Sequence, residues 1–220
     1  MGKIAIDIEH LTVQVGGQKI LSNLSLRLAK GRKATLVGPS GSGKSTLLLA
    51  LLGFVAPSEG TIRIFEEELT ASSVWRLRTR MAYVSQEPEM GEGTVRRILN
   101  HPFTFKNNRH LQDNMERAPE LMEKLYLPGH LLDKDIASLS GGEKQRVALI
   151  SALLLEREIL LLDEASSALD QSAKQAAIDL LYSRGDLTML SVTHDREWIE
   201  AADDLIELSG MQQNLKGSTS

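Results

Sequence analysis

The residues with the clearest chemical meaning form the glycine-rich string Gly38-Pro39-Ser40-Gly41-Ser42-Gly43-Lys44-Ser45-Thr46. Its spacing matches G-x-x-x-x-G-K-[ST], and it lies between the strand-like run Ala34–Val37 and the apolar segment Leu47–Leu52. Glycines let the backbone curl so that N–H groups face phosphate oxygens, and the start of a helix adds positive potential. We therefore predict a phosphate-binding loop in which Lys44 contacts the β- and γ-phosphates of a nucleotide and the Ser45 hydroxyl binds Mg²⁺. The strand-then-helix context argues against the alternative, a glycine-serine turn without function.

A second set of chemical groups is the acidic pair Asp163 and Glu164, which follows the apolar run Ile159–Leu162. Such a run predicts a strand buried on both faces, and open α/β sheets bind ligands at the carboxyl ends of their strands. Neighbouring strand residues point to opposite sides. We therefore expect Asp163 to bind Mg²⁺ and Glu164 to face the attacking water as its general base or orienting group. By itself the pair could simply cap a helix, but beside a phosphate loop it predicts nucleotide hydrolysis.

A third motif is the string Leu139-Ser140-Gly141-Gly142-Glu143-Lys144-Gln145-Arg146, which precedes an apolar helical stretch. Ser140 is a natural helix N-cap, and the two glycines leave backbone N–H groups uncovered, which suits an anion. A capped helix with no other role is the alternative. The string lies just upstream of the acidic strand. With the phosphate loop and the acidic pair in this order, the sequence resembles the ABC ATPases from its N-terminal β region to His194.

The resemblance implies roles for three further residues. Gln86, after the strand-like run Met81–Ser85, resembles the Q-loop glutamine that touches Mg²⁺ and the water; a surface glutamine is the alternative. Asp170, in the string Ser167-Ala168-Leu169-Asp170, resembles the D-loop residue that contacts the opposite subunit, or it caps a helix over residues 171–182. His194 resembles the switch histidine that hydrogen-bonds the γ-phosphate, although a lone histidine is more often structural.

The same resemblance implies a homodimer. Ser140, Gly141 and Gly142 of a second copy would close over the γ-phosphate held by the first, so that two molecules of ATP lie between two chains. One residue departs from the family pattern: Val15 stands where an aromatic ring commonly stacks on adenine. Base stacking contributes about 1–3 kcal/mol, so we expect weaker discrimination of the adenine ring.

Periodicity predicts an α/β fold, and the phosphate-loop motif with the family resemblance implies that its core is that of a P-loop NTPase. Alternating residues up to Leu28 predict an N-terminal antiparallel β region, and later strand-like runs separated by helix-length segments predict a mainly parallel sheet. Helical spacing of Leu111, Met115, Leu121 and Leu125, interrupted by prolines, predicts an inserted helical lobe. The expected division is a single domain 1–210, with a nucleotide-binding core 1–86 and 139–210, a helical lobe 87–138, and a flexible tail 211–220.

Composition narrows the possible partners. The 220 residues carry a net charge of -4, which offers no overall basic field for nucleic acid, and we expect no nucleic-acid partner. The absence of cysteine excludes disulfides and thiolate metal sites. No apolar run is long enough to cross a bilayer, and residues 1–10 lack the apolar core of a signal peptide. The resemblance therefore implies a peripheral protein on the cytoplasmic face of the cell membrane, bound to a separately encoded permease subunit.

The resemblance implies a function: an ATPase subunit that couples dimer closure on Mg-ATP to transport. The lobe length and the residues after Asp163 look closest to small bacterial export subunits of the iron-export kind. Met90, Val95, Ile98 and Leu99 are expected in or near a groove for the membrane subunit, or else in the core of the lobe. Two rivals are a non-transport ABC ATPase that drives cofactor assembly or envelope machinery, and a regulatory module without turnover. Glu164 argues against the second.

Overall fold

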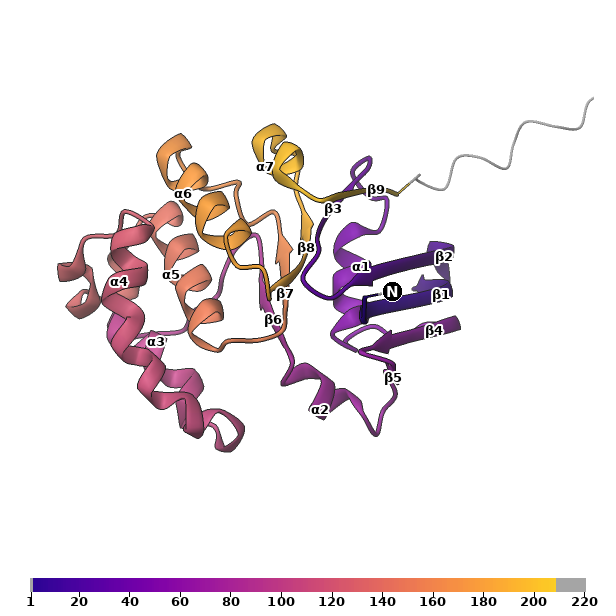
Figure 1. Ribbon diagram of the computed structural model, residues 1–220, viewed down its shortest axis with the longest axis horizontal. Coiled ribbons are helices and arrows are strands. Elements are labelled where there is room, and N and C mark those ends of the chain that lie inside the picture. Colours follow the sequence, from indigo (N-terminus) through magenta and orange to yellow (C-terminus); the bar gives the residue numbers. More distant parts are fainter. Residues whose placement is uncertain (1, 209–220) are drawn as a thin grey trace, which may run out of the picture.

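Five parallel strands form the central sheet, in the order β6-β7-β8-β3-β9, as seen in a computed structural model that describes residues 2–208 (Figure 1). All four neighbouring pairs are parallel. The strands are β3 (Lys33–Val37), β6 (Met81–Val84), β7 (Ile159–Asp163), β8 (Thr188–Val192) and β9 (Asp204–Glu207). The predicted parallel sheet is thus confirmed, and β9 is a strand that the sequence analysis missed. The tail predicted at residues 211–220 lies outside the described residues.

A second, antiparallel sheet has the strand order β2-β1-β4-β5. Its strands are β1 (Ile4–Val15), β2 (Gln18–Ala29), β4 (Glu59–Ile64) and β5 (Glu67–Glu68). Gly16 and Gly17 join the first two strands with φ angles of 58° and 80°, which suits a tight two-residue hairpin turn. The N-terminal antiparallel region is therefore confirmed. Its extension by β4 and β5, from far along the chain, was not predicted.

Strand β7 anchors a hydrophobic cluster on each face of the parallel sheet. Ile159 and Leu161 pack into the cluster shared with β1 and with helix α1 (Lys44–Leu51), which lies between the two sheets (Figure 1). Leu160 and Leu162 pack into the cluster on the other face. A parallel strand covered on both sides must be apolar at every position, which explains the uninterrupted run before Asp163.

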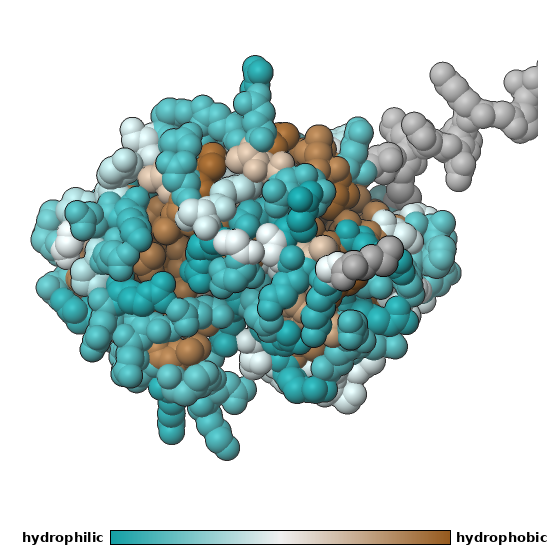
Figure 2. Space-filling view, viewed as in Figure 1, coloured by the Kyte–Doolittle hydropathy of each residue, from teal (hydrophilic) through white to brown (hydrophobic). Residues whose placement is uncertain are grey.

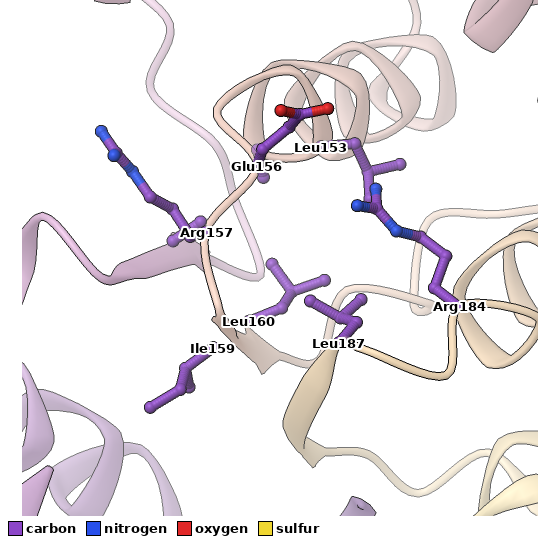
Figure 3. A pocket seen from close by; sticks show the side chains of 9 residues that line it. Leu153, Glu156, Arg157, Ile159, Leu160, Arg184 and Leu187 are labelled. Carbon is purple, nitrogen blue, oxygen red and sulfur yellow. The ribbon is translucent and has the colours of Figure 1, made fainter. Parts of the chain in front are cut away.

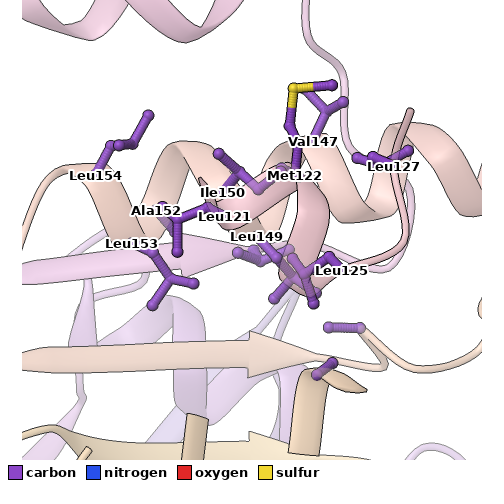
Figure 4. Packing of buried hydrophobic residues seen from close by; sticks show 14 of the residues in the cluster. Leu121, Met122, Leu125, Leu127, Val147, Leu149, Ile150, Ala152, Leu153 and Leu154 are labelled. Carbon is purple, nitrogen blue, oxygen red and sulfur yellow. The ribbon is translucent and has the colours of Figure 1, made fainter. Parts of the chain in front are cut away.

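Helices cover the other face of the parallel sheet. Helices α5 (Gly141–Leu154) and α6 (Gln171–Tyr182) pack on it, and the residues of α5 meet those of α4 in one buried cluster (Figure 4). The helical segments between β6 and α5 are α3 (Val95–Asn100), η1 (His101–Thr104), η2 (Lys106–Arg117), α4 (Ala118–Lys124), η3 (Gly129–Asp133) and η4 (Ile136–Ser138). Two short helices complete the set, α2 (Val74–Arg78) and α7 (Arg196–Ala201).

The helical segment predicted from Leu111 and Met115 differs from a regular α-helix. Residues Lys106–Arg117 form a 3₁₀ helix in which both side chains are only partly buried. Pro119 lies in the first turn of α4, where its missing N–H costs nothing, and it separates the two segments as expected. Leu121 and Leu125 are buried.

The described residues contain no helix long and apolar enough to span a bilayer. The longest helix, α5, has 14 residues, whereas a span needs about 20. On the face shown in Figure 2 hydrophobic residues form patches within a mainly hydrophilic surface.

The double-sided burial of β7 predicts a large effect of truncation. Replacing Leu161, which is 0% exposed, with alanine is expected to lower the free energy of unfolding by about 2–5 kcal/mol through lost burial and a residual cavity. The matched control is Leu205→Ala on edge strand β9, where the side chain is 60% exposed and a change within about 0.5 kcal/mol is expected. Urea unfolding measures both. Equal effects would contradict the assignment of β7 as a strand buried on both faces.

Candidate active site

The parallel sheet brings four predicted groups to one edge. The phosphate loop follows β3, Gln86 follows β6, Asp163 ends β7 and His194 follows β8. Because these strands are parallel, their carboxyl ends share an edge, which is where open α/β sheets bind ligands. Groups that are far apart in the sequence therefore lie along one edge of the sheet.

The phosphate loop has a backbone that its glycines make possible. Gly43 has a φ of 93°, and a Cβ added there would lie 2.6 Å from Leu21 Cδ2, so only glycine fits. Lys44 is buried, and its Nζ donates hydrogen bonds to the carbonyls of Gly38 at 2.9 Å and Pro39 at 3.0 Å. No carboxylate within residues 2–208 pairs with Lys44. Its charge is therefore available to an anion held in the loop.

Asp163 links the phosphate loop to the sheet. The Ser45 hydroxyl donates to Asp163 Oδ1 at 3.0 Å, and the Tyr83 hydroxyl donates to Asp163 Oδ2 at 3.3 Å. Burial, followed by the charge of Asp163, raises the pKa of Tyr83 to about 12, so this hydroxyl remains a proton donor at neutral pH. Both oxygens of a buried carboxylate are thereby held in place.

The residues around Asp163 fit a magnesium ion that also binds phosphate. A hydroxyl and a carboxylate are the hard oxygen ligands that Mg²⁺ prefers. No group of three or more His, Cys, Asp and Glu side chains in the described part of the chain could hold a metal by itself. A magnesium ion at Ser45 and Asp163 would therefore complete its shell with phosphate and water oxygens, as is usual for this ion in nucleotide sites.

Glu164 occupies a turn and not the strand. Strand β7 ends at Asp163, and Glu164 has a φ of 50°, with its N–H bonded to the Val192 carbonyl at 2.8 Å. The sequence analysis expected strand alternation to point Asp163 and Glu164 to opposite sides. That reason is wrong, because Glu164 lies beyond the strand in a left-handed turn. Glu164 Oε1 lies 3.4 Å from His194 Nε2, a contact that the sequence analysis did not predict. A left-handed conformation is uncommon for a glutamate, although Glu66 and Glu156 also adopt it in this chain.

The position of His194 is fixed by its neighbours. Asp195 caps α7 by accepting hydrogen bonds from the N–H groups of Glu197 and Trp198, and its carboxylate also pairs with Lys174 on α6. On the other side, the Thr193 hydroxyl bonds Ser166 at 3.0 Å. The His194 side chain itself is 62% exposed. Anchors on both sides thus present an accessible imidazole beside Glu164.

The start of α5, which we call the Ser-Gly-Gly tip (Ser140, Gly141, Gly142), is closed by a capping box. Ser140 Oγ accepts from the N–H of Glu143 at 3.3 Å, and the Ser140 N–H donates to Glu143 Oε2 at 2.8 Å. The backbone N–H and then the hydroxyl of Ser140 hold the pKa of Glu143 below its usual value. Ser140 and Gly141 are exposed. A Cβ on Gly142 would lie 2.6 Å from the Ala168 carbonyl, so this glycine lets the tip pack against the loop before α6.

Three predicted residues or groups make no hydrogen bond or ion pair with the other site residues within residues 2–208. Gln86 is exposed, and no hydrogen bond of the described residues ties its side chain to Asp163 or Glu164. Asp170 caps α6 by accepting from the Ala173 N–H at 2.9 Å, the alternative role considered for it. No hydrogen bond or ion pair found between residues 2 and 208 links the Ser-Gly-Gly tip to the phosphate loop.

A family model described as "ABC transporter" matches residues 21–167 of the chain. The chain belongs to this family. A probable iron export ATP-binding protein of Escherichia coli (strain K12) is 34% identical over 206 residues, which is 92% of this chain and 90% of that protein. An energy-coupling factor transporter ATP-binding protein of Bacillus subtilis (strain 168) is 33% identical, covering 91% of this chain and 72% of its own length.

Solved structures agree with this family. A dimeric ATP-binding cassette in a post-hydrolysis state bound to ADP and Pi superimposes with a TM-score of 0.82 at 25% identity, over 97% of this chain and 100% of that one. The predicted ABC ATPase fold is confirmed, and the family makes this chain an ATP-binding protein that hydrolyses ATP. It is an ATPase subunit of the kind found in transporters.

Tyr83 is the residue of this site that the sequence analysis missed. A tyrosine in a strand is ordinarily a packing residue, and its contact with Asp163 joins positions 80 residues apart. The signal that could have found it is its place one residue before the end of β6, beside the strand that delivers the acidic pair.

Replacing Tyr83 with phenylalanine tests this contact. The ring remains and the hydrogen bond to Asp163 is lost, so we expect the Mg²⁺ concentration for half-maximal ATPase activity to rise by about threefold to tenfold, as for the loss of one ordinary hydrogen bond. Turnover at saturating Mg²⁺ is expected to change little. The control is Tyr182→Phe, another partly buried tyrosine, whose hydroxyl donates to the Trp198 carbonyl. A magnesium requirement equal in both variants would contradict the positioning role of Tyr83.

The two glycines of the tip offer a matched pair. Gly142→Ala is expected to lower the free energy of unfolding by about 1–3 kcal/mol, because the added methyl group meets the Ala168 carbonyl. Gly141→Ala is expected to be neutral or slightly stabilising, since nothing lies within 4 Å and alanine favours a helix. Thermal unfolding without nucleotide distinguishes them. Indistinguishable melting temperatures would mean that the tip is not packed on the loop as described.

Proposed function

We propose that this chain is the ATPase subunit of a membrane transporter and works as a homodimer that encloses two molecules of Mg-ATP. The observation that carries the proposal is the division of the site. The phosphate loop, Asp163, Glu164 and His194 meet at one sheet edge, whereas the Ser-Gly-Gly tip, exposed at Ser140 and Gly141, has no polar link to that edge within residues 2–208. A second copy can supply the tip, and the similarity to a dimeric ATP-binding cassette supports this arrangement.

The phosphate loop binds and orients the nucleotide. Its backbone N–H groups and the start of α1 face the phosphates, and Lys44 exchanges its bonds to two loop carbonyls for phosphate oxygens. Ser45 and Asp163 would hold Mg²⁺, and the ion would supply positive charge that stabilises the phosphates. Phosphoryl transfer depends mainly on such positioning and charge stabilisation.

Glu164 and His194 act on the attacking water. Glu164 accepts the water's proton or orients the water toward the γ-phosphorus, and ATP and water yield ADP and phosphate. His194, 3.4 Å from Glu164, holds the carboxylate and presents its imidazole to the γ-phosphate. The Ser-Gly-Gly tip of the second copy closes over the same phosphate with its N–H groups and excludes bulk water. Closure is therefore favoured by ATP and reversed by its hydrolysis.

Gln86 and the cleft beside it provide the route to the membrane subunit. A cleft of about 480 Å³ lies between β6, α3 and α5, and Met90 and Ile98 are among its lining residues. Val95 and Leu99 are 0% exposed, so the alternative expected for them, lobe core, is correct. We propose that a cytoplasmic loop of a separately encoded permease occupies this cleft, which places the chain on the inner face of the membrane. The similarity to a probable iron export protein favours an exporter.

Glu164→Gln tests the proposed cycle. We expect turnover to fall by about 10²–10⁴-fold, as for loss of a general base, with ATP binding retained and an ATP-dependent dimer trapped. Steady-state ATPase assays and small-angle scattering with Mg-ATP measure these outcomes. The control is Glu120→Gln, an exposed acid on α4 paired with Lys124, which should leave both unchanged. Undiminished turnover would refute the role of Glu164, and single subunits in the Mg-ATP-loaded variant would refute the shared site.

A further inference from the structure

A second groove lies along the seam between α2 and the helical lobe. Its volume is about 530 Å³. Its lining residues are polar, cationic or aromatic: Trp75, Arg76, Thr79, Asn107, His110 and Arg157. We call it the seam groove. No acidic side chain is among them. Arg76 is paired with Glu67 beside the groove, which leaves Arg157 as the lining cation to consider.

Arg157 carries a charge that no carboxylate of residues 2–208 neutralises. Its guanidinium donates to Asn108 Oδ1, and burial lowers the pKa of Arg157 from its usual value. In Figure 3 the side chain extends away from Leu160 and Leu187. A half-buried arginine without a counter-charge is costly, and a carboxylate that bonds its planar fork would offset that cost.

Trp75 lines the seam groove, and its ring contacts the guanidinium group of Arg78. The Arg78 guanidinium carbon lies 4.8 Å from the Trp75 ring and 4.2 Å from the Phe54 ring, so the cation is layered between the two. Arg78 Nε also donates to the Leu52 carbonyl at 2.6 Å. The two aromatic residues nevertheless remain 73% and 65% exposed. Large aromatic side chains that are fixed and exposed are typical anchors of protein interfaces.

The seam groove adjoins the cleft beside Gln86. Asn108 accepts from Arg157 and donates to the carbonyl of Pro102 at 2.9 Å, and Pro102 lines the cleft. Thr79 lines the seam groove and Met81, two residues on, lines the cleft. A polypeptide seated in the cleft therefore needs to continue only a short way to reach Arg157.

We propose that the seam groove binds an acidic stretch of the permease's cytoplasmic loop, with a carboxylate on Arg157 and an apolar side chain against Trp75. This inference rests on the proposed function, because the occupant belongs to the same membrane subunit. The charge of the groove and its continuity with the cleft identify the occupant. The contact would set which permease this ATPase accepts, since like charges at the same place would be rejected.

Crosslinking separates this inference from the proposed function. The chain has no cysteine, so one engineered cysteine carries one benzophenone crosslinker. In the complex with the co-purifying membrane subunit, Met90→Cys in the cleft and His110→Cys in the seam groove are both expected to crosslink to one cytoplasmic loop, with an Asp or Glu near the His110 product. Lys124→Cys on α4, 51% exposed, is the control and should not react with that loop.

Each result has a defined meaning. Crosslinks from Met90 alone overturn the seam-groove contact and leave the proposed function intact. Crosslinks from neither position overturn both. Reaction of His110→Cys with anionic lipid alone, in nanodiscs containing phosphatidylglycerol, would make this surface a membrane contact and also overturns the inference.

Charge reversal supplies the second test. Arg157→Glu is expected to weaken permease association by about tenfold or more, whereas Arg157→Lys keeps most of it. Basal ATPase activity should stay near that of the wild type, because Arg157 lies outside the active site. Replacing the crosslinked permease acid with lysine should restore association with Arg157→Glu specifically. Unchanged association in Arg157→Glu, or no restoration, would overturn the contact.

Discussion

The two-sided burial of β7 is the constraint on which the rest of the structure depends. Its alternate residues belong to different hydrophobic clusters, so one strand holds the antiparallel sheet and α1 on one side and α5 and α6 on the other. The strand must end where the polar site begins. Asp163 is therefore both the last strand residue and the buried carboxylate that receives Ser45 from the phosphate loop and Tyr83 from β6. Asp163 therefore belongs both to the buried strand and to the polar site.

The chain turns immediately after Asp163, and this turn places Glu164 beside His194. The left-handed conformation of Glu164 directs its carboxylate toward His194 while Asp163 stays against the loop. Strain of this kind persists only where neighbouring contacts over-determine it, here the bond from the Glu164 N–H to the Val192 carbonyl. Contacts within this chain thus hold both acids in place, which suits the proposed completion of the site by a second copy.

Local signals in the sequence predicted much of this, and long-range contacts limited the rest. The phosphate loop, the helix over residues 171–182 and the Ser140 cap depend on neighbours within a few positions, and the structure has them where expected. Strand β9 is only four residues long, and the 3₁₀ helix η2 has no periodicity that distinguishes it from an α-helix. The bonds of Tyr83 to Asp163 and of Arg157 to Asn108 join distant segments, so no local pattern announces them.

The buried side chain of Gln145 connects the start of α5 to the chain segment that precedes Gln86. It lies in the string that resembles the family signature, yet its side chain is 0% exposed and its Nε2 donates to the Ser85 carbonyl at 3.2 Å. Ser85 immediately precedes Gln86 and lines the cleft, whereas Gln145 belongs to the first turns of α5, the helix that begins with the Ser-Gly-Gly tip. This hydrogen bond ties the first turns of α5 to the backbone immediately before Gln86. A glutamine rather than an apolar residue is suited to this place, since the strand has just ended and the Ser85 carbonyl needs a donor.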